Sequence, residues 1–302
     1  MSQMHGTATY EAGTDGTPPR RPGQGRAALP LTPARRVALL IGVPVCLAIT
    51  GFIGFDLVAM VGKGHFHFSH TFAASTRQLS VDAGGGNVVV ESAASGPARL
   101  SGEAYYSLIR PTITERASAD SATLTYPCDL PAGNCGLNAT VSVPEGIAVA
   151  ISSGGGDLTA SGLSGHVSLS ADGGDLTATG ITGDVSLQTG GGNLTAARLA
   201  GDIDLGASGG DITATSIDSP RVTAASGGGN VEIVFTQVPQ DVQVTASGGD
   251  VTIVVPAGPA TYEVTASADG GNLTDSVPQA PSSSRKITAS SGGGDVTIEQ
   301  ST

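Results

Sequence analysis

Residues 154–215 read GGGDLTASGLSGHVSLSADGGDLTATGITGDVSLQTGGGNLTAARLAGDIDLGASGGDITAT, and this stretch decides the fold. Asp157, Asp175, Asn193 and Asp211 lie 18 residues apart, each after at least two glycines and before Leu-Thr-Ala or Ile-Thr-Ala. Midway between them, GHVSL, GDVSL and GDIDL begin a second strand-like segment. The unit is therefore a repeat of two nine-residue halves, and such a repeat indicates architecture more strongly than chemistry.

Apolar side chains alternate along each half, as Leu158 and Ala160 do in one and Val167 and Leu169 in the next, so each strand turns one face inward. Two short strands cannot bury their own apolar face, and neighbouring copies must therefore stack. Stacking predicts two ladders of inward residues, namely Leu158, Leu176, Leu194 and Ile212, and Val167, Val185 and Ile203. We predict an all-β fold, a β-solenoid resembling a parallel β-helix. The alternative is an antiparallel β-sandwich or meander, because hairpins also use short halves.

One position of the repeat carries the only plausible chemistry, an Asp or Asn after the glycines. Its members are Asn87, Asp157, Asp175, Asn193, Asp211, Asn230, Asp250, Asn272 and Asp295. Acids and amides nearly alternate, and we expect them to form turns, each side chain bonding the turn backbone. The alternative is a Ca²⁺ ladder like that of nonapeptide repeats, although these acids recur only every 18 residues or more. The turn interpretation predicts no cofactor and no metal site.

The region before the repeats predicts a membrane anchor. Residues 1–36 are rich in Gly, Pro, Thr and Arg without apolar periodicity, which indicates a disordered tail. Residues 37–61 begin with 19 uncharged residues, about the ~20 needed to span a bilayer. Arg35 and Arg36 precede this segment and only Lys63 follows it, so the N-terminus is predicted to be cytoplasmic. A cleaved signal peptide is the rival reading, but no A-x-A site follows. A juxtamembrane linker at 62–76 and an extracytoplasmic β-repeat domain at 77–302 complete the predicted organisation.

The charge distribution excludes one class of partner. The formal net charge of −12 combines +3 on residues 1–36 with −15 on residues 64–302. An acidic ectodomain without a basic stripe does not bind nucleic acid, because it cannot displace the counterions of the phosphates.

Cys128 and Cys135 lie in the Pro- and Gly-rich loop TYPCDLPAGNCGL. Outside the cytoplasm, two cysteines seven positions apart across a turn predict a disulfide that closes a small loop. A metal-binding pair and two free thiols are the alternatives.

Two phrases carry a resemblance to a known family, VPEGIAVAISSGGGDLTA at 143–160 and VPAGPATYEVTASADGGNLT at 255–274. With the recurring G-G-[DN] motif, the region from about 75 to 300 resembles the bacterial domain family of unknown function labelled "putative adhesin". The resemblance implies a β-solenoid-like envelope domain behind a membrane anchor, and it implies no catalytic residues.

These observations predict a single-pass bacterial cell-membrane protein with a non-catalytic, structural, adhesive or interaction role. Its partners would be a cell-wall polymer, an envelope protein, or a second copy joined through the C-terminal strand GGGDVTIEQST. One alternative is a sensory or accessory component of an envelope-stress system. Another is an enzyme acting on polysaccharides, since parallel β-helices host such enzymes, but here the carboxylates lie at turns.

Overall fold

The computed structural model describes residues 63–107, 110–127 and 135–302. The predicted tail at 1–36 and the predicted membrane helix at 37–61 lie outside these residues and stay predictions. Within the described ranges, no helix has the length and apolar character needed to cross a membrane.

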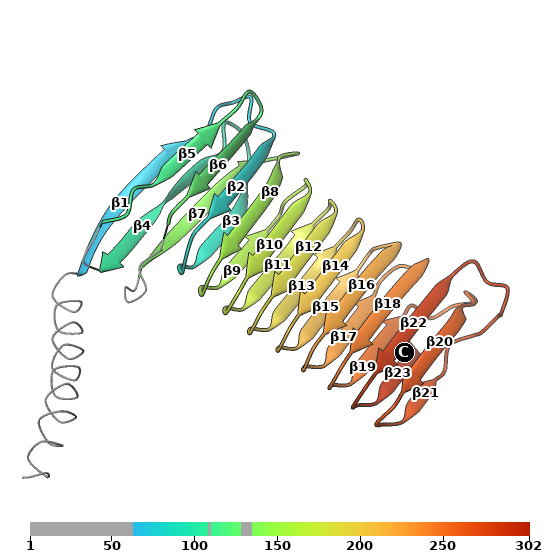
Figure 1. The fold of residues 1–302 in the computed structure, drawn as a ribbon. Helices are drawn as coiled ribbons and strands as arrows, with labels where there is room; N and C mark the ends of the chain where they lie inside the picture. Colours follow the sequence, from blue (N-terminus) through green and yellow to red (C-terminus); the bar gives the residue numbers. More distant parts are fainter. Residues whose placement is uncertain (1–62, 108–109, 128–134) are drawn as a thin grey trace, which may run out of the picture. The chain divides into compact units, whose positions relative to one another are not determined.

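The described chain is all-β and forms two sheets (Figure 1). Sheet A has 12 strands in the spatial order β1 (Lys63–Thr71), β4 (Arg99–Ser107), β7 (Gly136–Pro144), β3 (Val88–Ala93), β9 (Leu158–Ser161), β11 (Leu176–Ile181), β13 (Leu194–Leu199), β15 (Ile212–Ile217), β17 (Val231–Phe235), β19 (Val251–Val255), β23 (Val296–Gln300), β21 (Leu273–Asp275). Sheet B has 11 strands in the spatial order β20 (Glu263–Ala268), β22 (Lys286–Ser291), β18 (Asp241–Ala246), β16 (Arg221–Ser226), β14 (Ile203–Ala207), β12 (Val185–Thr189), β10 (Val167–Ala171), β8 (Ala148–Ser153), β2 (Gln78–Asp82), β6 (Ser121–Thr125), β5 (Thr114–Ala117).

The chain alternates between the sheets, so that one strand of sheet B and the following strand of sheet A make one rung of a solenoid. Rungs stack in parallel and in register: Leu176 pairs with Leu158 and Leu194, and Val185 pairs with Val167 and Ile203. The predicted parallel solenoid and both predicted ladders are confirmed. Among the described strands, antiparallel pairing is confined to β1–β4, β4–β7 and β5–β6.

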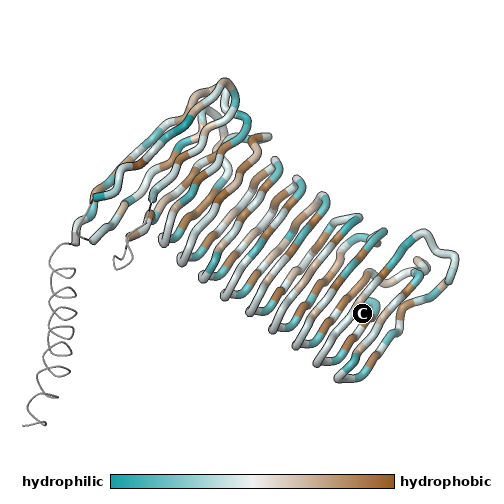
Figure 2. The backbone as a smooth tube through the Cα atoms, in the orientation of Figure 1, coloured by the Kyte–Doolittle hydropathy of each residue, from teal (hydrophilic) through white to brown (hydrophobic). Residues whose placement is uncertain are grey.

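The core lies between the two sheets and consists of small aliphatic side chains. Alternate residues of the inner rungs are buried, as in β10 and β11, and Figure 2 shows the resulting alternation of apolar and polar residues along the strands. The turns require glycine where rungs approach most closely. A Cβ on Gly192 would overlap the Gly174 carbonyl of the preceding rung, because turns spaced ~4.8 Å apart leave no room for a side chain there.

The first strand lies within the predicted juxtamembrane linker, so the β domain begins earlier than expected. Phe66 and Phe68 alternate with exposed His65 and His67 in β1, and both phenylalanines pack against the core. β1 pairs with β4 in antiparallel orientation and its apolar face points inward, so residues 63–71 are part of sheet A.

The order of rungs differs from the order of the chain at both ends. At the N-terminal end, the rung of β6 and β7 lies outside that of β2 and β3. At the C-terminal end, β22 and β23 lie inside β20 and β21. The C-terminal strand through which a second copy was expected to join is therefore not an open edge, because β23 pairs with β19 on one side and β21 on the other. The outermost strand of sheet A is β21, where Leu273 is 49% exposed.

Candidate functional surface

The nine Asp and Asn residues of the repeat form one row, here called the Asp/Asn ladder, just before strands of sheet A. The Oδ1 atom of one member accepts the backbone N–H of the member in the next rung, as from Asp175 to Asp157 at 3.0 Å and from Asn193 to Asp175 at 2.7 Å. The same bond joins Asp157 to Asn87, Asp211 to Asn193, Asn230 to Asp211, Asp250 to Asn230, Asp295 to Asp250, and Asn272 to Asp295. Eight of the nine side chains thus bond a turn backbone, and that turn belongs to the neighbouring rung, while the outermost member, Asn272, donates its amide to Asp295 Oδ1 at 3.3 Å.

The ladder has a tenth member that the sequence pattern does not reveal. Asn138 Oδ1 accepts the backbone N–H of Asn87 at 3.0 Å, because β7 packs outside β3. The spatial order also places Asp295 directly after Asp250, before Asn272. The expected alternation of acids and amides therefore fails at this end, and adjacent carboxylates occur there because the last two rungs exchange places.

The ladder atoms do not gather as metal ligands would. Oδ1 of each bonded member already accepts a backbone N–H, and the members lie one rung apart on an exposed row. In the described ranges, no three His, Cys, Asp or Glu side chains lie close enough together to hold a metal ion. The arrangement fastens one turn to the next, which is a structural role.

A second set of polar side chains, buried and overlooked in the sequence, also ties the rungs together. From β2 to β20, the inward residue at or just after the end of each sheet B strand alternates between Ala and a hydroxyl along the stack, as Ala83, Ser153, Ala171, Thr189, Ala207, Ser226, Ala246, Ser291 and Ala268. Thr189 Oγ1 donates to the Gly174 carbonyl at 2.9 Å and accepts the Gly192 N–H at 3.2 Å. Part of the signal was present in the sequence, because each of these four hydroxyls directly precedes an uninterrupted Gly-Gly-Gly run, whereas the first such run follows Ala83.

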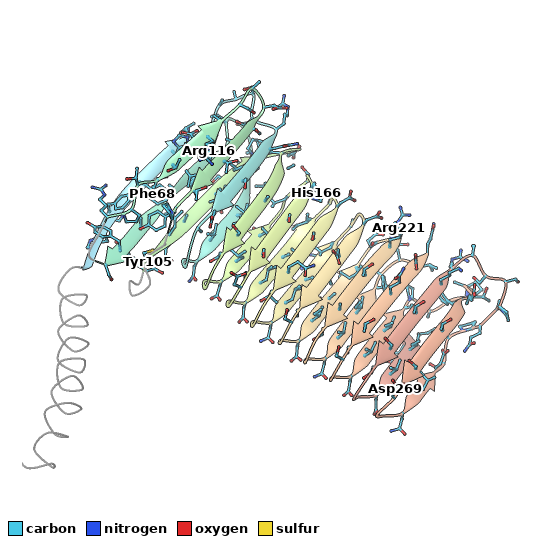
Figure 3. All side chains as sticks on the ribbon, viewed as in Figure 1. Phe68, Tyr105, Arg116, His166, Arg221 and Asp269 are labelled. Atoms are coloured by element: carbon cyan, nitrogen blue, oxygen red, sulfur yellow. The ribbon has the colours of Figure 1, made fainter. Side chains whose placement is uncertain are left out.

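A row of charged residues lies at the start of the sheet B strands, on the opposite side from the Asp/Asn ladder. Arg221 Nε lies 3.1 Å from Asp202 Oδ2, and Lys286 Nζ lies 3.6 Å from Glu263 Oε2. His166 borders this row, and Figure 3 shows it and Arg221 on the same side of the stack. These pairs are exposed and contribute little to stability, so the row is a solvated face.

The predicted disulfide stays a prediction, because Cys128 lies outside the described residues. Cys135 directly precedes β7, beside the Gly85 turn.

Aromatic side chains gather at the N-terminal end, where Figure 3 shows Tyr105 and Phe68. Tyr126 is fully buried, and its hydroxyl donates to the Tyr105 carbonyl at 2.9 Å. Burial, aided by the neighbouring Tyr105 and Tyr106, raises the pKa of Tyr126 to about 12, against the opposing effect of Arg110.

Tyr105 lies on the outward face of β4, beside polar groups. It pairs with His65 of β1 and Gly136 of β7, and its hydroxyl donates to the Gly85 carbonyl at 3.1 Å. A hollow of about 370 Å³ lies here, lined by Gly64, His65, Glu103, Tyr105, Tyr106, Ser107 and Asn138.

A comparison with a solved structure agrees with this architecture. A "putative adhesin" structure from Parabacteroides distasonis ATCC 8503 is 15% identical, with a TM-score of 0.51, covering 79% of this chain and 97% of its own. A "putative adhesin" from Bacteroides fragilis NCTC 9343 is 13% identical, with a TM-score of 0.46 and coverage of 79% and 97%. At 15% identity, the first likeness concerns the fold alone. No curated protein matches the sequence.

The family model of the Toastrack domain DUF4097 matches residues 134–302, which is more than half of the chain. The expected resemblance to an adhesin-like domain of unknown function is confirmed at this level. The chain belongs to the Toastrack DUF4097 family.

Proposed function

We propose that this protein is a non-catalytic, envelope-anchored adhesion scaffold that binds an extended envelope polymer along its outer faces. The observation that carries the proposal is the regularity of those faces. Threonines of neighbouring strands lie side by side on the outside of sheet A, with Thr177 paired to Thr159 and Thr195, and Thr195 to Thr213. Such a row offers hydroxyl donors and acceptors every ~4.8 Å, which suits a long partner better than a small molecule.

The polar side chains of the middle rungs also support a scaffold. Stack position, turn geometry and core packing already account for the polar side chains of the middle rungs, namely the Asp/Asn ladder and the buried hydroxyls. The "putative adhesin" from Parabacteroides distasonis, which shares the fold, points to the same class of role.

Anchoring and orientation belong to the proposal as well. The predicted membrane segment at 37–61 precedes β1 directly, and the positive-inside rule places the repeats outside the cytoplasm. The solenoid would then present its outer faces to the wall or to neighbouring cells.

The test compares three strains: wild type, a deletion of the whole gene, and a deletion of residues 1–30. The proposal predicts that the first and third bind purified envelope polymer and neighbouring cells equally, while the gene deletion loses adhesion. If removal of residues 1–30 abolishes the response of the strain to envelope stress although adhesion and the level of the protein in the membrane are unchanged, the envelope-stress sensor is the better account.

A further inference from the structure

We propose that the outward corner of β1, β4 and β7, here called the N-terminal corner, binds one pyranose ring of a neutral envelope glycan. The corner consists of His65, Glu103, Tyr105, Gly136 and Asn138. The inference rests on the proposed function, since a scaffold that binds an envelope polymer needs a place where single sugar units are recognised.

Tyr105 is a preformed stacking platform. A Cβ on Gly136 would overlap the Tyr105 hydroxyl, so the ring covers Gly136 in the space left by the missing side chain. The bond from this hydroxyl to the Gly85 carbonyl, 3.1 Å long, fixes the ring across the sheet. The backbone of β7 and of the Gly85 turn therefore holds the ring in place, and Tyr105 remains half-buried. A ring already held in place loses little entropy on binding.

The position of Tyr105 sets it apart from the other rings. Phe66 and Phe68 pack against the core, and Tyr126 and Tyr262 are fully buried. Tyr106 pairs with Gly64 on the inward face. Within the ranges that the structure describes, Tyr105 is thus the only Phe or Tyr on an outward strand face.

Polar groups surround the ring with complementary chemistry. His65 Nε2 lies 3.9 Å from Glu103 Oε1, and the two side chains are 72% and 44% exposed. Glu103 pairs across the sheet with Asn138, whose Oδ1 is taken by the Asn87 N–H. The Asn138 amide nitrogen has no hydrogen-bond partner among the described residues. The corner therefore offers a carboxylate acceptor, amide donors and an imidazole around one ring, which match the hydroxyl and amide groups of a sugar.

The negative charge of the β-repeat domain favours a neutral glycan over a polyanionic polymer. Residues 64–302 carry a formal charge of −15, which repels polyanionic chains such as those built on phosphodiesters. The hollow of about 370 Å³ lies at the small end of the range for small-molecule sites, and it fits one ring with its substituents. A pyranose has an apolar C–H face and polar edges, which correspond to the ring of Tyr105 and to Glu103 and Asn138 respectively.

The experiment titrates the full chain, in a detergent without a sugar headgroup, with tetra-N-acetylchitotetraose as a neutral N-acetylhexosamine probe. Affinity is measured by saturation-transfer NMR and calorimetry. Tyr105→Leu keeps apolar cover and removes the ring, and we expect it to weaken binding about tenfold. Tyr105→Phe keeps the ring and should stay within about threefold of wild type. Glu103→Gln should weaken binding about fivefold, and Glu232→Gln, on the outer face of sheet A far along the stack, should have no effect.

Each outcome decides one claim. If wild type binds the probe and Tyr105→Leu binds equally well, the N-terminal corner is not the subsite, while the adhesion role stands. If wild type does not bind the probe at all, the glycan assignment is overturned, and the strain comparison still reports on adhesion independently. Unfolding curves accompany every variant, and because Glu103→Gln changes an exposed side chain, its effect reports on binding even if Tyr105→Leu unfolds.

Discussion

The middle rungs and the N-terminal corner have similar outward strands but use their polar side chains differently. In the middle, from β8 to β19, Asp175, Asn193 and Thr189 each bond the backbone of a neighbouring turn. At the N-terminal corner, Glu103 and His65 make only a long, exposed contact with each other. Side-chain atoms that hold the stack together are not free to hold a ligand, so the comparison places the recognition of single sugar units at the irregular end, in addition to the polymer contacts proposed for the exposed threonine row of the middle rungs.

The two ends of the solenoid differ as well. The N-terminal end is closed by antiparallel strands, with β1 extending sheet A and β5 extending sheet B. A hydrogen bond of 3.0 Å between His70 and Glu115 joins these two strands. The C-terminal end leaves Leu273 exposed, but the short edge strand β21 places Asp275 opposite the inward-facing Ile298. An inward-pointing carboxylate on a short strand protects an edge against unwanted pairing.

The largest loss of stability is expected from a substitution at a turn where two rungs are in contact. In Gly192→Ala the new Cβ would overlap the Gly174 carbonyl, and because backbone cannot move aside, unfolding free energy should fall by roughly 3 kcal/mol. Gly191→Ala is the matched control, since its nearest neighbour is the Gly173 oxygen at 3.8 Å, and it should change stability by no more than about 0.5 kcal/mol. Denaturant unfolding measures both. Equal effects of the two variants would show that the rungs are not packed in this register.

The second largest loss of stability is expected from removing a buried hydroxyl. Thr189→Val keeps the side-chain volume but leaves the Gly174 carbonyl and the Gly192 N–H without their partner, which should cost about 1–3 kcal/mol. Thr195→Val, on the exposed row of sheet A, should stay within about 0.5 kcal/mol of wild type. The melting temperatures of the two variants test whether buried and exposed threonines differ as described. A similar loss for both would contradict the difference.

Two buried tyrosines allow the ends to be compared. Tyr126→Phe removes the bond to the Tyr105 carbonyl and should cost about 1 kcal/mol, because a buried acceptor loses its donor. The hydroxyl of Tyr262, at the other end, has no partner among the described residues, so Tyr262→Phe should raise stability by up to about 1 kcal/mol. Chemical unfolding at neutral pH measures both changes. Destabilisation by both variants to the same degree would contradict the assignment of bonds.

The stability of the protein at alkaline pH is a second test of Tyr126 and Tyr262. The folded chain holds the Tyr126 proton up to about pH 12, while the unfolded chain releases it near 10, so stability is full below pH 10 and falls as pH rises toward 12. Tyr126→Phe should remove part of this fall. Burial also raises the pKa of Tyr262, despite Arg285, and Tyr262→Phe should act in the same direction. A pH profile unchanged in both variants would show that neither phenol is buried.

The smallest effect concerns the Asp/Asn ladder. Asp175→Ala removes the acceptor of the Asn193 N–H and should cost about 1 kcal/mol, whereas Asp175→Asn keeps an acceptor and should be nearly neutral. Chelator and added Ca²⁺ should leave the melting temperature of wild type unchanged. A loss for Asp175→Asn as large as for Asp175→Ala, or a rise in melting temperature with Ca²⁺, would restore the metal hypothesis.

The repeat fixed most of the fold in advance, because its spacing sets the register of each rung. Leu158, Leu176 and Leu194 form the predicted ladder for this reason. The exchange of rungs at both ends could not be predicted, since it depends on pairings such as β7 with β3 that lie far apart in the chain. Asn138 joined the Asp/Asn ladder only through that pairing.

The candidate site was harder to predict than the fold. The sequence around Tyr105, ARLSGEAYYSL, predicts only a strand with alternating inward and outward residues and does not single out this tyrosine. Its significance comes from Gly136, which lies 31 positions away and supplies the space that the ring covers. The Asp and Asn residues that dominate the sequence pattern use their Oδ1 atoms to bond the backbone of the neighbouring rung.

One measurement tests most directly the claim that the middle is scaffold and the N-terminal corner recognises a ligand. Hydrogen–deuterium exchange of the full chain is followed with and without tetra-N-acetylchitotetraose, peptide by peptide. We predict added protection in β1 and β4, at 63–71 and 99–107, with the middle rungs from 158 to 217 unchanged. Protection confined to 158–217 would contradict the account.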